Sequence, residues 1–121
     1  MKEFFVQDLM YGYHVGVLVG DRKKTTEFMK NKYDVDFDFK QNASSFSLEG
    51  KFEKDFIWIE RFTWLIEEQA LLAHEILHHT FKTMRRIGIG FSEESDEAFT
   101  WYFQHLMQQT WWALKKLRAT K

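Results

Sequence analysis

Apolar and polar residues in the first half of the chain follow patterns that are typical of β-strands. Residues 13–19 are mostly apolar and are followed by Gly20, which predicts a buried strand. Residues 34–39 alternate strictly between acidic and apolar side chains, with Val35, Phe37 and Phe39 on one face, which predicts a half-buried strand. The complete set of expected strands is residues 13–19, 34–39, 44–48 and 56–60, with turns at Gln41–Asn42 and Glu49–Gly50.

The second half of the chain has the periodicity of helices. Two long helices are expected, over residues 64–84 and 96–117, with a glycine-containing loop between them. A shorter helix is expected to begin after Asp21, whose side chain can cap it, and to continue to about residue 32. Because strands and helices are segregated along the sequence, we expect one α+β domain over residues 1–121. In it, a small, mainly antiparallel sheet packs against the two long helices.

The composition of the chain limits which partners are expected and which residues could bind a metal. The chain carries 17 Lys and Arg against 18 Asp and Glu, so no excess of positive charge favours nucleic acid or an anionic membrane as a partner. It has no cysteine, which leaves histidines and carboxylates as metal ligands. Gln7 and Asp8 interrupt the first apolar residues, unlike a signal peptide, and no stretch approaches the roughly 18 apolar residues of a membrane span. A cytoplasmic location is therefore expected.

Residues 74–79 read His-Glu-Ile-Leu-His-His and fall in the middle of the first long predicted helix. Residues four apart on a helix lie on the same face, so His74 and His78 can bind one ion, with ring nitrogens about 2.0–2.1 Å from it. Glu75 can reach a water on that ion, and this spacing is the His-Glu-x-x-His pattern of zinc metallopeptidases. His79 points about 100° away and is expected to be a supporting or surface residue.

A catalytic zinc site needs a third protein ligand and one open position. Glu97 lies in the first turn of the second long predicted helix, and an antiparallel helix pair would return it toward His78. We therefore expect zinc to be bound by His74, His78 and Glu97. Three neighbouring carboxylates are alternatives, either as the third ligand or as groups that orient a ligating imidazole: Glu93, Glu94 and Asp96.

With this pattern the chain resembles the gluzincins, zinc metallopeptidases in which a Glu on the helix after the His-Glu-x-x-His helix is the third ligand. The resemblance covers residues 55–107 and is to a minimal form, similar in size and plan to small peptidases of phages and other mobile elements. It implies a zincin-like fold in which the strand at 56–60 lines the substrate cleft. Phe81 and Met84 stand where the metzincin branch has Gly and His, so the chain does not resemble that branch.

The resemblance implies hydrolysis of peptide bonds in a peptide or protein substrate, with Zn2+ as cofactor. Zinc lowers the pKa of its bound water to about 7, and Glu75 accepts the proton as general base. A further donor would stabilise the oxyanion, and we favour His105, two turns after the glutamate ligand on the same helix. The other candidates are Tyr102, Tyr13 and His14.

Two classes of function stay open. The first is a small zinc endopeptidase. The second is a zincin-fold structural or interaction protein, for example a phage-related assembly component, with a structural or vestigial metal site. A cleft open above the metal with an unpaired strand edge beside it would favour the peptidase, whereas a sealed site would favour the structural role.

Overall fold

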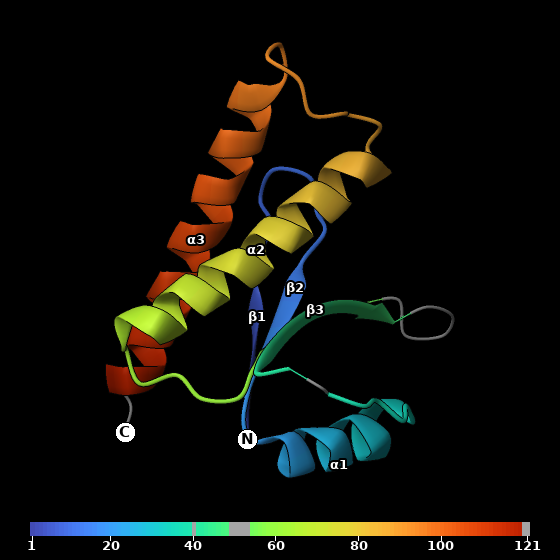
Figure 1. Ribbon diagram of the computed structural model, residues 1–121, viewed down its shortest axis with the longest axis vertical. Helices are drawn as coiled ribbons and strands as arrows, with labels where there is room; N and C mark the ends of the chain where they lie inside the picture. The colour runs from blue at the N-terminus through green and yellow to red at the C-terminus, as the bar shows by residue number, and fades with distance from the viewer. Residues whose placement is uncertain (40, 49–53, 120–121) are drawn as a thin grey trace.

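The computed structural model describes residues 1–39, 41–48 and 54–119, and within them the chain forms one four-stranded sheet and three helices (Figure 1). This confirms the α+β class. The long helix expected over residues 64–84 is continuous, and no helix in the described ranges has the length and apolarity needed to cross a lipid bilayer. The elements are β1 (Lys2–Val6), β2 (Val15–Val19), α1 (Arg22–Tyr33), β3 (Ala43–Leu48), β4 (Lys54–Ile59), α2 (Ile66–Arg86) and α3 (Asp96–Ala119).

The sheet is mixed, with strand order β1-β2-β4-β3. β1 pairs antiparallel with β2, and β3 pairs antiparallel with β4, while the central pair β2 and β4 is parallel. This order corrects the expectation that the strand at 56–60 borders a cleft, because β4 is paired on both sides. In the described part of the chain, β3 is the edge strand on that side of the sheet.

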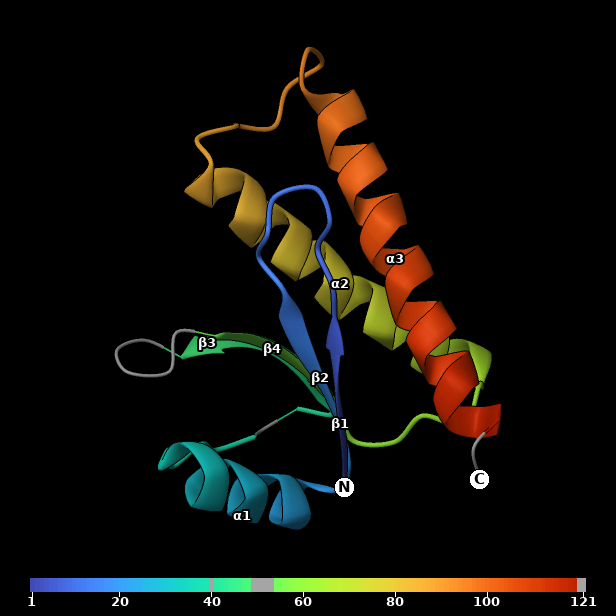
Figure 2. The same cartoon turned by 180° about the vertical axis from the view of Figure 1, so that it is seen from behind.

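The sheet is covered on both faces, which explains why β4 is apolar on both of its faces. Successive side chains of a strand point to opposite faces. Ile57 and Ile59 belong to a core shared with α2 and α3, whereas Phe56 and Trp58 belong to a second core shared with α1. Figure 1 shows α2 in front of the sheet, and Figure 2 shows the same helix behind it.

Residues 34–39 correct another expectation, because they form no strand. Asp34 ends α1 in the left-handed conformation, with φ 54°, and residues 35–39 follow without regular secondary structure. Phe39 is buried in the α1-side core, and Phe37 and Val35 pack against that core. The alternating pattern therefore reflects the burial of one face of an extended segment. It did not report hydrogen bonding to a neighbouring strand.

The two long helices pack on each other and on the sheet through one shared core. Leu72 and Ile76 of α2 and Tyr102 and Leu106 of α3 are at most 1% exposed and belong to the same cluster. At the start of α2, the Glu68 carboxylate accepts hydrogen bonds from backbone N–H groups of the preceding turn, which would otherwise lack partners. The core and the cap together fix the direction of α2 across the sheet.

Asp8 is the polar residue that ties the β1–β2 loop to α3. Its side chain is 2% exposed and accepts hydrogen bonds from the Tyr102 hydroxyl at 2.6 Å and from the N–H groups of Met10, Tyr11 and Tyr13 at 2.8–3.0 Å. Burial alone would raise the pKa of Asp8, but these four donors outweigh burial and hold it below the usual value of 3.8.

We expect Asp8→Asn to lower the free energy of unfolding by about 2–3 kcal/mol at pH 7, because the charged acceptor in this buried cluster is lost. The folded pKa is lowered, so the ionised Asp8 contributes stability above pH 3.8 and loses it as the pH falls through the folded value. The difference between wild type and Asp8→Asn should therefore shrink in urea titrations below that pH. Glu27→Gln, an exposed change on α1, is the control and should have little effect.

Candidate metal centre

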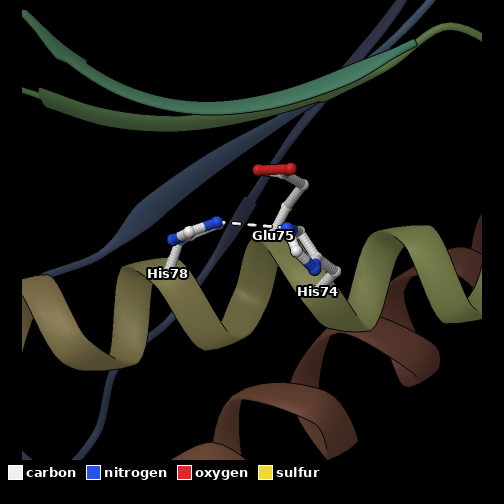
Figure 3. A group of neighbouring side chains, drawn as sticks. All are labelled: His74, Glu75 and His78. Atoms are coloured by element: carbon white, nitrogen blue, oxygen red, sulfur yellow. Dashed lines mark hydrogen bonds between the residues drawn. The ribbon is translucent and has the colours of Figure 1, made fainter. Parts of the chain in front are cut away.

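The candidate site is formed by three side chains on consecutive turns of α2. His74 and His78 are exposed and Glu75 is buried. The Nε2 atoms of the two histidines are 3.1 Å apart, and each residue of the group places a ligand atom within 4.8 Å of the others. Figure 3 shows the three side chains on the side of α2 turned toward the sheet strands, with the ribbon of α3 on the other side. The helical spacing thus brings the three expected groups together.

The separation of the two imidazole nitrogens suits a single zinc ion. Two nitrogens bound about 2.0–2.1 Å from a tetrahedral zinc are roughly 3.3 Å apart. The observed 3.1 Å between Nε2 of His74 and Nε2 of His78 is close to that value, so a small rotation of either ring would bring the two nitrogens to the zinc-binding separation. Both rings are exposed and present these nitrogens on the same side of the helix, so an ion could reach them from solvent.

The buried position of Glu75 favours a basic carboxylate. Glu75 is 5% exposed, and burial raises its pKa above the usual value of 4.5. His78 and His74 oppose this rise electrostatically, as does a backbone hydrogen bond from Ser45. A carboxylate with a raised pKa accepts a proton more readily than a solvated one. The histidines are therefore accessible to a ligand, while the carboxylate beside them is shielded from water.

The contact with Ser45 places the group beside β3. Ser45 belongs to the strand that forms the described edge of the sheet, and its backbone hydrogen-bonds to Glu75. The arrangement thus places two exposed imidazoles near the described edge strand of the sheet, which is one of the two features expected of a peptidase site. The expected strand edge is present, although β3 supplies it in place of β4.

Glu97 lies apart from the two histidines. It is exposed in the first turn of α3 and does not belong to the metal-ligand group, and the same holds for Glu93, Glu94 and Asp96. The reason is the register of the helix pair. Phe99 of α3 packs on Phe81 of α2, with ring centroids 5.2 Å apart. Within the described residues, the expected third ligand is therefore not brought to the pair.

The four candidates for the oxyanion donor all contact the β1–β2 loop instead of the histidine pair. His105 Nε2 accepts a hydrogen bond from the Leu9 N–H at 3.1 Å, and His14 Nδ1 accepts one from the Asp8 N–H at 2.9 Å. Tyr102 and Tyr13 donate to the carboxylate of the same Asp8, through a hydroxyl and a backbone N–H respectively. These contacts give His105 and Tyr102 a role in holding the loop. The catalytic role expected for His105 therefore finds no geometric support.

A second polar cluster lies further along α2, and sequence analysis did not identify it. Asp55 of β4 is 5% exposed; its carboxylate forms an ion pair with Arg86 and accepts a 2.6 Å hydrogen bond from the Ser47 hydroxyl. Burial tends to raise the pKa of Asp55, but Arg86, Ser47 and His79 outweigh it and lower the pKa below 3.8. The one available signal was an aspartate at the start of an otherwise apolar strand.

His79 belongs to this cluster and not to the metal pair. It is fully buried, its Nε2 lies 3.3 Å from the Tyr13 carbonyl oxygen, and its Nδ1 lies 3.7 Å from the Asp55 carboxylate. Burial lowers its pKa below the usual value of 6.5, with Asp55 opposing the change. His79 is therefore a buried residue that faces the sheet and not a surface residue, and it lies about 100° round the helix from His78.

No protein-family model matches the chain, and neither the curated proteins nor the solved structures contain a match.

We expect His74→Ala and His78→Ala each to weaken zinc binding at pH 7.5 at least about 10–100-fold, the loss that follows even when a partner of a ligand is removed. Titration calorimetry with zinc measures this directly. Glu97→Gln tests whether Glu97 is a third ligand. The Glu97 carboxylate is exposed and lies outside the group of His74, Glu75 and His78, so its loss should leave the zinc affinity unchanged. A large loss in Glu97→Gln would restore the three-ligand site expected from the sequence. His105→Gln is the matched control.

Proposed function

We propose that the chain is a zinc-dependent hydrolase of peptide bonds, with His74 and His78 as metal ligands and Glu75 as general base. The observation that carries this proposal is the 3.1 Å separation of the two Nε2 atoms beside a buried carboxylate. The adjacent edge strand β3 supports it, since an unpaired strand can pair with an extended peptide. A zincin-like fold, in which the metal-binding helix packs against a sheet with a free edge, is part of the same proposal.

Each of the three residues has a distinct task in this proposal. His74 and His78 hold the ion through their Nε2 atoms, which must be neutral to bind. Glu75 holds the proton taken from the attacking water and delivers it to the leaving amine. Its burial prepares it for this task, because a raised pKa favours proton uptake. A bound zinc would supply Lewis acidity toward the water and the substrate carbonyl.

One observation favours the alternative, a structural or interaction protein with the same metal-binding pair. In the part of the chain that the structure describes, no carboxylate or imidazole besides Glu75 joins the two histidines. If Glu75 itself were the third ligand, the site would bind metal without a free base, which is typical of a structural centre. The two functions therefore differ in the role of one carboxylate.

We expect Glu75→Gln to abolish hydrolysis while retaining zinc, because the amide keeps the shape of the side chain and removes its basicity. A positioned general base contributes about 10²–10⁴-fold, so the rate should fall at least 100-fold. The assay is a mixed peptide library digested by each zinc-loaded protein and compared by mass spectrometry. Zinc content is measured on the same samples.

Glu67→Gln is the matched control, since Glu67 is an exposed glutamate in the first turn of the same helix. It should cleave the library as wild type does. Identical profiles for wild type and Glu75→Gln, or a loss of zinc in Glu75→Gln, would contradict the base role. The second result would identify Glu75 as a ligand and support the structural function.

A further inference from the structure

Lys82 is a half-buried cation on the face of α2 that carries Glu75. It is one turn after His78, and its Nζ donates a 2.9 Å hydrogen bond to the Ser47 hydroxyl of β3. Among the described residues, Lys82 has this one hydrogen-bond partner and no carboxylate within ion-pair distance. Its charge is therefore not neutralised by a direct anionic partner in the part of the chain that the structure describes.

The buried carboxylate of Asp55 has partners other than Lys82. Asp55 forms its ion pair with Arg86 and accepts a hydrogen bond from Ser47, so that the Ser47 hydroxyl donates to Asp55 while it accepts from Lys82. Burial lowers the pKa of Lys82, with Asp55 and Glu75 opposing the change from a distance. Removing an ammonium from water without an anionic partner is unfavourable, and a bound anion would remove this cost.

The distance between Lys82 and the proposed site of hydrolysis follows from two contacts with β3. Glu75 contacts Ser45, and Lys82 contacts Ser47. These positions are two residues apart on the strand, or about 7 Å. Along α2, the seven residues from Glu75 to Lys82 correspond to a rise of about 10 Å. An extended chain covers these distances in roughly two to three residues.

Space for a ligand continues beyond Ser47. A cavity of about 840 Å3 opens there, with Ser47, Asp55, Arg86 and Lys54 in its wall. Ser47 thus contacts Lys82 and also borders the cavity. Asp55 is paired with Arg86, whereas Lys82 has no ion-pair partner among the described residues, and Lys54 lies in the wall of the cavity.

We propose that the Lys82 ammonium binds a carboxylate of the substrate, two to three residues from the bond hydrolysed at Glu75. This proposal rests on the proposed hydrolase function and specifies its substrate class, a peptide with an acidic group at a fixed distance from the cleaved bond. The carboxylate is supplied either by the C-terminus of a short peptide or by an Asp or Glu side chain.

The test uses ligands that carry a zinc-binding hydroxamate and a carboxylate at a set distance. A hydroxamate is joined by a malonyl unit to one, two or three glycines that end in a carboxylate or in a primary amide. On zinc-loaded wild-type protein, calorimetry should show the carboxylate ligand binding at least about tenfold more tightly than its amide, the expected size of one charge-assisted hydrogen bond. The preference should be greatest with one or two glycines.

The variants assign this preference to one side chain. Lys82→Met keeps the length of the side chain, suits a half-buried position and should lose the preference, whereas Lys82→Arg keeps the charge and should retain most of it. Lys115→Gln, an exposed change on α3, should behave as wild type. A ligand with an internal Asp and an amide end shows whether the carboxylate bound by Lys82 is a side chain or a C-terminus. Tighter binding of either carboxylate than of the uncharged amide ligand supports the proposal.

A second measurement separates this proposal from the hydrolase function. In zinc-free protein, acetyl-Gly-Gly carboxylate should shift the NMR amide signals of Lys82 and Ser47 in wild type but not in Lys82→Met, and the amide form should not shift them. If these shifts occur but no hydroxamate binds with zinc, the metal site fails and the carboxylate site stands. Equal binding of acid and amide, with no shifts, overturns the role of Lys82 even if zinc binds.

Discussion

Burial of one face of α2 against the sheet and α3 is the constraint on which the rest of the structure depends. Leu72, Ile76 and Met84 are almost fully buried in the core shared with β2, β4 and α3, and this fixes the rotation of the helix about its axis. Once the rotation is fixed, the residues at the border of the buried face are fixed too. Glu75 is therefore held beside β3, with His74 and His78 one step further round the helix and exposed to solvent.

The same rotation determines the electrostatic environment of each polar residue along the helix. Glu75 is shielded from water, and this burial raises its pKa although the two neighbouring histidines oppose the rise. About three turns later, Arg86 forms an ion pair with the buried Asp55, and this pair lowers the pKa of the Asp55 carboxyl group. The pKa values of two buried acids at the interface of α2 with the sheet are thus shifted in opposite directions, because Asp55 has a guanidinium partner whereas burial dominates at Glu75. Such opposed shifts within a single helix–sheet interface are typical of functional sites, although structural ion pairs also produce them.

Features that depend on local spacing could be predicted from the sequence, and features that depend on long-range packing could not. The pairing of His74 with His78 follows from four-residue spacing on any helix, and the sequence predicts the helix itself well from its apolar period. The position of Glu97 relative to the histidines could not be predicted, because it depends on how far α3 is displaced along α2. The packing of Phe81 on Phe99 determines that displacement. The strand predicted over residues 34–39 was wrong for a related reason, since an alternating pattern indicates burial of one face but does not indicate a partner strand. β4 was recognised as a strand, but its place inside the sheet depends on parallel pairing with β2, which no local pattern indicates.

The placement of Glu75 and Lys82 on one rigid helix has a consequence for recognition. A substrate that contacts both residues must span a distance set by the helix rise and by the spacing of Ser45 and Ser47, and neither can change without unfolding α2 or β3. Groups held on regular elements define distances more precisely than groups on loops. Selectivity here would therefore reside in the separation between the reacting bond and the charge. The small domain, with no described element covering the exposed histidines, can discriminate among substrates by this separation without enclosing them.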